Sequence, residues 1–159
     1  MLAAFGRYYW RMRRGYSLAE LAVVLAVLGV VTAVTLPRLW GWLDWVAVDR
    51  AAVEVSTALA VARSAAVFDG SRSRLLIAAD SLRIDRRAGG SGGPQTAWQP
   101  YARWPGPAQH GVALEVSNPE VVFMPSGIAW GLSNTRVVLR RGSHEATITV
   151  SRVGRVKRW

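Results

Sequence analysis

The stretch from Arg13 to Pro37, RRGYSLAELAVVLAVLGVVTAVTLP, decides how this 159-residue chain is organised. The seventeen residues from Leu21 to Pro37 carry no charge, so this run must be buried. Counted from Tyr16 to Leu36 it has 21 residues, about 30 Å of α-helix, which matches the hydrocarbon thickness of a bilayer. Arginines precede the run, and the positive-inside rule therefore places the N-terminus in the cytoplasm.

An apolar run of this kind also occurs in a signal peptide that is removed after secretion and in the core helix of a soluble protein. A removed signal peptide ends in a small-x-small cleavage site, and Thr35-Leu36-Pro37 is a poor one. Trp40, Trp42 and Trp45 follow, where indoles would lie at the far headgroup layer. The sequence favours a retained single-pass membrane helix.

Composition excludes several classes of protein. Hydrophobic residues make up 51% of the chain, which rules out a disordered tail. With 20 Lys and Arg against 10 Asp and Glu the net charge is +10, which favours anionic partners. Cysteine is absent, and His110 and His144 are 34 positions apart. We therefore expect no disulfide, no metal site and no cofactor.

Glu20 is out of place in a plain membrane anchor. It lies at the cytoplasmic end of the apolar run. Placing an unpaired carboxylate at mid-membrane depth costs roughly 2.5–3.5 kcal/mol of free energy. Glu20 therefore needs a positively charged partner, which marks it as a functional position.

The nine residues from Arg13 to Leu21 resemble the type IV pilin-like signal. In that family, prepilin peptidase cuts after the glycine and then methylates the new N-terminal aromatic residue. The resemblance implies a basic leader at residues 1–15, or a shorter one if translation starts at Met12. The cut falls between Gly15 and Tyr16.

The same resemblance assigns roles to two further residues. Glu20 becomes the fifth mature residue and meets the N-terminal amine of a neighbouring subunit during filament assembly, which agrees with its need for a cation. Pro37 stands where pilins carry a helix-kinking proline. The implied partners are prepilin peptidase, other pilin-like subunits and the bacterial inner membrane, with the headpiece in the periplasm.

Beyond Pro37 the pattern stays helical and ends at Asp69-Gly70, because glycine is common just past a helix C-terminus. We expect one helix of about 50 residues, membrane-spanning over residues 16–37 and amphipathic over residues 38–69. Its apolar stripe recurs at spacings of three and four, at Trp45, Val48, Ala52, Val55, Leu59, Ala62 and Ala66.

After Gly70 the periodicity becomes strand-like, with turn signals between the apolar runs. Strands are expected at residues 74–78, 82–85, 112–116, 121–124, 136–140 and 147–151. The glycine-rich stretch 88–94 predicts a flexible loop, since no Gly-Lys-Ser/Thr follows it. The predicted fold is α+β: an antiparallel sheet in a headpiece over residues 70–159, packed on the helical stripe.

Three segments of the headpiece resemble the minor pseudopilin group that unites pseudopilin H of type II secretion (GspH) with the FimT minor pilins. They are Ala62-Arg63-Ser64-Ala65, the segment from Phe123 to Gly127, and the segment from Val150 to Val156. In the second segment, Pro125 and Gly127 predict a tight turn between strands. Gly154 in the third allows a positive φ.

The sequence does not indicate an enzyme. Its carboxylates are scattered, and Glu145 beside His144 would point to the opposite face of a strand. Ser126 lies in Pro-Ser-Gly and not in a Gly-x-Ser-x-Gly elbow.

The C-terminus is strongly basic. A nucleic-acid interface here would use Arg152, Arg155, Lys157, Arg158 and Trp159, supported by Arg136, Arg140 and Arg141. Residues 154–158 also resemble the Gly-Arg-x-Arg tail of FimT pilins that bind DNA, with Lys157 where Arg is typical and Arg158 one place late. The alternatives are a solvated tail and a tail that docks on acidic neighbours in a filament.

Together these features favour a minor pseudopilin, a structural subunit of a type II secretion filament or of a related type IV pilus. The alternative is a FimT-like minor pilin that binds DNA for uptake in natural transformation. In either case we expect the protein to assemble into a filament and to make contacts there, and not to act as an enzyme.

Processing provides the first test. We expect Gly15→Ala to block cleavage, because prepilin peptidase needs the flexible glycine that the apolar helix holds at the cytoplasmic face. Mass spectrometry of membrane-extracted protein should find Tyr16 at the N-terminus of the wild type and not of the variant. Normal cutting of the variant would contradict the pilin-like signal.

Overall fold

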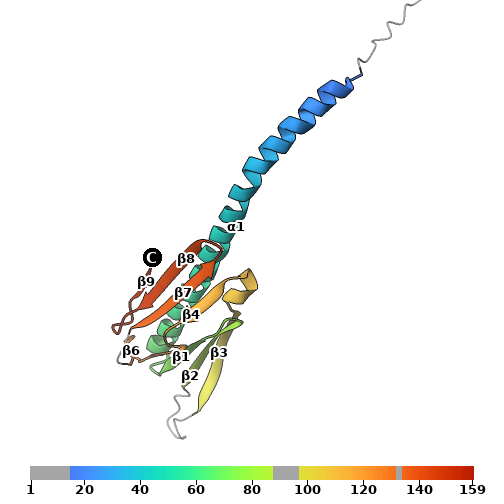
Figure 1. Cartoon of the computed structure of the whole chain (residues 1–159). Helices are drawn as coiled ribbons and strands as arrows, with labels where there is room; N and C mark the ends of the chain where they lie inside the picture. The colour runs from blue at the N-terminus through green and yellow to red at the C-terminus, as the bar shows by residue number, and fades with distance from the viewer. Residues whose placement is uncertain (1–14, 88–96, 132–133) are drawn as a thin grey trace, which may run out of the picture. The chain divides into compact units, whose positions relative to one another are not determined.

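The computed structural model describes residues 15–87, 97–131 and 134–159, and its fold is α+β as predicted (Figure 1). The described chain divides after Arg38 into two compact units, the second being Leu39–Trp159. Helix α1 (Leu18–Phe68) contributes to both and includes Pro37. It ends one residue before Asp69, and Gly70 has a φ of +59°, so the predicted helix end is confirmed. The predicted kink at Pro37 stays a prediction.

The part of α1 in the first unit is long and apolar enough to cross a membrane, with a mean hydropathy of 2.3 over its most apolar window. No residue of that window is buried within the chain. Its two hydroxyl groups are satisfied inside the helix, since Thr32 Oγ1 donates to the Leu28 carbonyl and Thr35 Oγ1 to the Val31 carbonyl. Within the described residues, this part of α1 therefore exposes apolar side chains and no unpaired hydroxyl, as a bilayer requires.

The second unit contains two antiparallel sheets, where the sequence predicted one. Sheet A has the order β3-β2-β1-β5-β6, and sheet B has the order β4-β7-β8-β9. The strands of sheet A are β1 (Ser73–Ile77), β2 (Ser81–Arg87), β3 (Trp98–Pro105), β5 (Glu120–Phe123) and β6 (Ala129–Trp130). Those of sheet B are β4 (Ala113–Val116), β7 (Thr135–Arg141), β8 (His144–Val150) and β9 (Val156–Arg158). A short 3-10 helix, η1 (Pro107–His110), precedes β4.

Each of the six predicted strands coincides with an observed one, and the structure adds β3, β6 and β9. Strand β3 contains Pro100 and Pro105, and proline argues against a strand when only the sequence is known. As an edge strand it tolerates both. Strands β6 and β9 have two and three residues, too few to show a period. The predicted loop at residues 88–94 lies outside the described residues.

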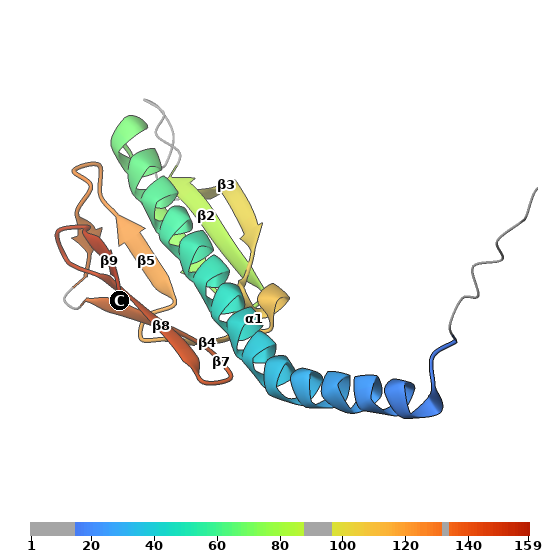
Figure 2. The ribbon, with the colours of Figure 1, turned by 90° about the horizontal axis from the view of Figure 1, so that it is seen from above.

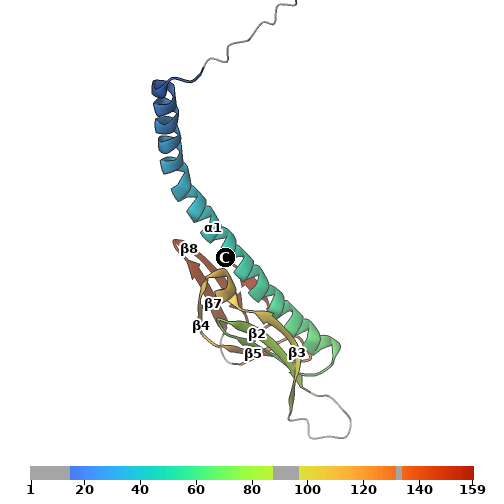
Figure 3. The ribbon, with the colours of Figure 1, turned by 90° about the vertical axis from the view of Figure 1, so that its right-hand side faces the viewer.

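The core lies between α1 and the inner faces of both sheets (Figures 2 and 3). The predicted stripe is confirmed from Val48 to Ala66, but Trp45 is 51% exposed and is not part of it. The buried side chains of α1 are Ala47, Val48, Ala51, Ala52, Val55, Ala58, Leu59, Ala62, Ala65 and Ala66. Sheet A supplies Leu75, Ile84 and Phe123 to the same core, and sheet B supplies Val137, Leu139 and Ile148.

Four polar pairs surround this core and tie α1 to four different elements. Each uses an acidic residue in or just after the headpiece half of the helix: Asp44 with Arg141 of β7 (2.8 Å), Asp49 with Arg158 of β9 (3.0 Å), Glu54 with His110 of η1 (3.0 Å) and Asp69 with Arg86 of β2 (3.1 Å). Partly exposed pairs contribute little stability one by one. Because the pairs are spread around the helix, together they favour one rotational orientation of α1 about its own axis relative to the sheets.

The predicted turn at Pro125-Ser126-Gly127 is confirmed. The Gly127 amide donates to the Met124 carbonyl at 2.8 Å, and φ is +76° at Gly127. Gly154 has a φ of +75°, and a Cβ there would lie 2.1 Å from the Gly127 carbonyl oxygen. This close approach requires glycine at position 154 and brings the turn before β9 against the turn after β5.

The packing predicts where the chain can be cut without loss of folding. A fragment starting at Asp44 keeps the buried face of α1 and all four polar pairs, so it should be a folded, soluble monomer. A fragment starting at Gly70 exposes the inner faces of both sheets and should aggregate. Size-exclusion chromatography and circular dichroism measure both outcomes. A folded, monodisperse Gly70 fragment would show that α1 is not needed for the headpiece core.

Candidate assembly motif and basic surface

The predicted processing and assembly residues lie at the start of α1. Gly15 and Tyr16 precede the helix, and Tyr16 is 88% exposed. Glu20 is in the first helical turn and is also exposed. The scissile bond proposed from the sequence is therefore outside the helix, and the glutamate is within its first turn.

Ser17 and Glu20 form a reciprocal cap that was not predicted from the sequence. The Ser17 amide donates to Glu20 Oε2 at 2.9 Å, and the Glu20 amide donates to Ser17 Oγ at 3.2 Å. This is the capping box, whose Ser-x-x-Glu spacing is present in Ser17-Leu18-Ala19-Glu20 and could have revealed it. It satisfies two of the free amides at the helix start.

The cap leaves part of the Glu20 carboxylate available. Only Oε2 accepts a hydrogen bond within the described residues, and a carboxylate can accept about four. Glu20 can therefore keep its helix cap while Oε1 meets a cation from another molecule.

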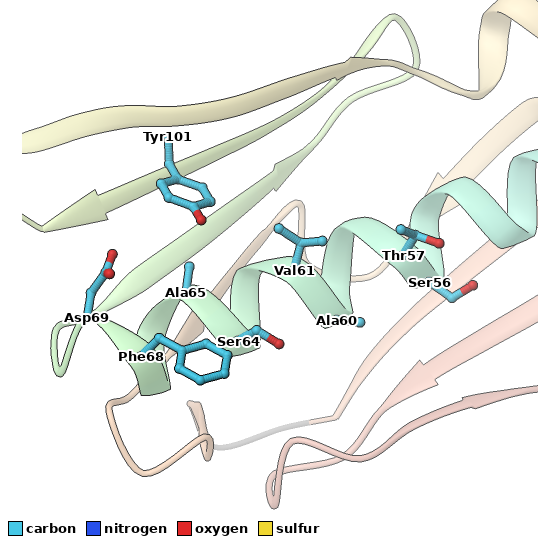
Figure 4. Close-up of a pocket in the computed structure, with 9 residues that line it drawn as sticks. All are labelled: Ser56, Thr57, Ala60, Val61, Ser64, Ala65, Phe68, Asp69 and Tyr101. Atoms are coloured by element: carbon cyan, nitrogen blue, oxygen red, sulfur yellow. The ribbon is translucent and has the colours of Figure 1, made fainter.

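The face of α1 that neither sheet covers includes a run of small side chains, Thr57, Ala60 and Ser64. Figure 4 shows a hollow on this face, with Thr57, Val61 and Ala65 on the side toward Tyr101 of β3 and Ser56, Ala60 and Ser64 along the other side. Phe68, at the end of the helix, is 86% exposed beside it. Small side chains allow the backbone of a second helix to approach closely.

The basic C-terminus is an ordered strand. Strand β9 pairs with β8, with Val156 opposite Val150 and Lys157 opposite Thr149. The Trp159 amide also donates to the Thr147 carbonyl at 2.9 Å. The sequence suggests a tail here, but these residues form the edge of sheet B.

Strand pairing separates the five predicted nucleic-acid residues. Arg158 lies on the inner side of β9. Its guanidinium is 3.0 Å from Asp49 of α1, so Arg158 forms an ion pair within the chain. Lys157 points to the opposite side, where its Nζ lies 3.3 Å from the centroid of the exposed Trp159 ring. Arg152 and Arg155 lie in the turn before β9 and are exposed.

The three supporting arginines are separated too. Arg140 binds Glu145 at 2.8 Å and Glu115 at 3.5 Å, and Arg141 binds Asp44. The hydrogen bond from Arg140 lowers the pKa of Glu145 below its ordinary value, which keeps the carboxylate ionised. Arg136 has no carboxylate within salt-bridge distance in the part of the chain that the structure describes.

Four cations without a carboxylate partner among the described residues gather at one end of sheet B. Arg136, Thr149 and Lys157 form one row across β7, β8 and β9 on the outer face. Arg152 and Arg155 come from the turn at the same end. We call Arg136, Arg152, Arg155 and Lys157 the sheet B basic cluster.

The acidic residues and histidines that the structure describes are scattered or already paired. Within residues 15–87, 97–131 and 134–159, no three His, Asp or Glu side chains are grouped as a metal site would need. Glu145 is engaged by Arg140, and His144 faces the other side of β8, where it lies near Gly41 of α1.

Comparisons with known proteins agree with this architecture. The family described as Type II transport protein GspH matches residues 51–154, and the Prokaryotic N-terminal methylation motif matches residues 10–36. A comparison with curated protein sequences finds no match.

Two kinds of solved structure are similar. The type IV minor pilin FimU of Pseudomonas aeruginosa (strain PAO1) has a TM-score of 0.55 at 17% identity, over 69% of this chain and 86% of FimU. The minor pseudopilin EpsH of the Type 2 Secretion System of Vibrio cholerae has a TM-score of 0.56 at 12% identity, over 70% of this chain and 95% of EpsH. At these identities the likeness is one of fold.

Proposed function

This chain belongs to the Type II transport protein GspH family, and we propose that it is a minor pseudopilin of a type II secretion filament assembled from the bacterial inner membrane. The family is one of structural pilin-like proteins and not of enzymes. The observation that carries the proposal is the joint presence of the methylation motif and the GspH headpiece on one continuous helix. In the proposed topology, the N-terminus is cytoplasmic and the headpiece is periplasmic.

Assembly follows from the start of α1. Cleavage after Gly15 by prepilin peptidase would create an ammonium group at Tyr16, and the apolar run would hold it at the membrane. The ammonium group of one subunit can pair with Glu20 of the next, whose Oε1 is not used by the helix cap. In the headpiece, the small-residue face of α1 offers a surface for neighbouring pilin-like subunits.

One observation favours the alternative, a FimT-like minor pilin that binds DNA. The sheet B basic cluster has no carboxylates to neutralise it within the described residues, and Trp159 lies beside Lys157. Arg158 cannot contribute freely, because it pairs with Asp49. A DNA-binding surface here would use Arg136, Arg155 and Lys157 for phosphate contacts.

The assembly proposal is tested with two matched variants. Glu20→Gln keeps an oxygen that can cap Ser17 and removes the charge, whereas Ser17→Ala removes a cap group and keeps the charge. We expect Glu20→Gln protein to be cleaved normally but to co-purify with other pilin-like subunits at least about tenfold less, because a buried cation loses its partner. Ser17→Ala should have little effect on this co-purification, because the charge of Glu20 is kept. Unchanged co-purification of Glu20→Gln would count against the ion pair between subunits.

The DNA alternative predicts a salt dependence. Binding of the headpiece to a short duplex should weaken with salt, with a log–log slope of about −0.9 per phosphate neutralised. Replacing Arg136, Arg155 and Lys157 by Gln should flatten the slope by roughly two to three. Arg158→Gln is the control. It should leave the salt slope nearly unchanged, because the Arg158 guanidinium already pairs with Asp49. Absence of duplex binding at about 50 mM salt would remove this alternative.

A further inference from the structure

The outer face of sheet A carries a second basic surface that neither assembly nor the sheet B basic cluster uses. Helix α1 covers the inner face of sheet A, and no helix covers the outer one within the described residues (Figures 1 and 3). Strand register shows which residues share the outer face. Its charged and aromatic members are Arg72, Arg74, Arg83, Asp85, Arg87, Trp98, Arg103, Glu120 and Trp130.

This face has five guanidinium groups and two carboxylates, so it carries an excess of positive charge. Both carboxylates are already engaged: Asp85 binds Arg74 at 2.9 Å and Arg83 at 3.3 Å, and Glu120 binds Arg74 at 3.4 Å. Arg72 and Arg103 have no salt bridge to a carboxylate within the described residues. The uncompensated charge therefore attracts anions.

Two indole rings lie on the same face, each stacked by an arginine. The Arg74 guanidinium carbon lies 4.5 Å from the centroid of Trp98, and that of Arg72 lies 4.8 Å from the centroid of Trp130. Cation–π contact orients each guanidinium over one face of its ring. Trp130 is nevertheless 60% exposed, so part of its ring remains open to a ligand.

The positions of the rings define an extended track. Trp98 is on β3 and Trp130 on β6, the two edge strands of sheet A, so about 20 Å separates them at the usual strand spacing. Arg87 of β2 and Arg72, which directly precedes β1, lie between them, and the Arg87 amide donates to the Arg72 carbonyl. Beside Trp130 lies a hollow lined by Met124, Ile128 and Val153. A hollow next to an exposed indole can accept a flat ring.

We propose that the outer face of sheet A binds single-stranded nucleic acid. Guanidinium groups are donors only, which suits phosphate oxygens, and indole rings stack on unpaired bases. A duplex keeps its bases inside and would leave both indoles unused. A neutral sugar polymer needs acceptors as well as donors, and both carboxylates of this face are occupied. The inference does not depend on the proposed role in secretion.

The test uses the full-length protein in detergent and a fluorescent 20-nucleotide oligothymidylate at about 50 mM salt. We expect binding that Trp130→Ala weakens by about 5- to 150-fold, because one stacked base is lost, and that Trp130→Phe largely restores. Arg72→Gln should weaken binding and flatten its salt dependence by close to one phosphate contact. Thermal melting establishes that each variant is folded.

Three comparisons make the test decisive. Arg136→Gln with Lys157→Gln, on the outer face of sheet B, should change oligothymidylate binding less than Trp130→Ala does. A duplex of the same length should bind with no effect of Trp130→Ala. The proposal is overturned if oligothymidylate does not bind, if only the sheet B variants weaken it, or if polygalacturonate binds this face and oligothymidylate does not.

Discussion

The headpiece depends on the burial of one alanine-rich face of α1 between two sheets. Residues such as Ala51, Ala52, Ala58 and Ala62 are essentially inaccessible, and their small side chains let strands from both sheets approach the helix closely. Larger residues of the same face, Val55 and Leu59, belong to one core cluster with Phe123 of sheet A and Leu139 of sheet B. Neither sheet has another helix to cover its inner face within the described residues, so both require α1.

That constraint explains how charge is distributed. The acidic residues in or directly after the headpiece half of α1 each pair with an arginine or histidine on a different surrounding element. Arg158 and Arg141 are used in this way, although the sequence alone groups them with the basic C-terminus. Arginines without such a partner include Arg136 on the outer face of sheet B and Arg72 directly before β1.

Sequence patterns predicted the parts of this fold that have a long period or a special residue. The apolar run, the stripe from Val48 to Ala66 and the turns at Gly127 and Gly154 were all predictable, because each rests on local chemistry. The division into two sheets was not, since it depends on pairings such as β1 with β5 that join distant segments. For the same reason the sequence could not show that Arg158 faces Asp49, which lies 109 positions earlier.

The cap formed by Ser17 and Glu20 has a consequence for proteolysis. It fixes the first helical residue at Leu18, so Gly15 and Tyr16 stay outside the helix even though a strongly helix-forming run follows directly. A peptide bond inside an α-helix is shielded by its own hydrogen bonds, whereas one in non-helical chain can enter the cleft of a protease. Glu20, whose charge suits contact with a neighbouring subunit, thus also keeps the peptide bond after Gly15 outside the helix, where a protease can reach it.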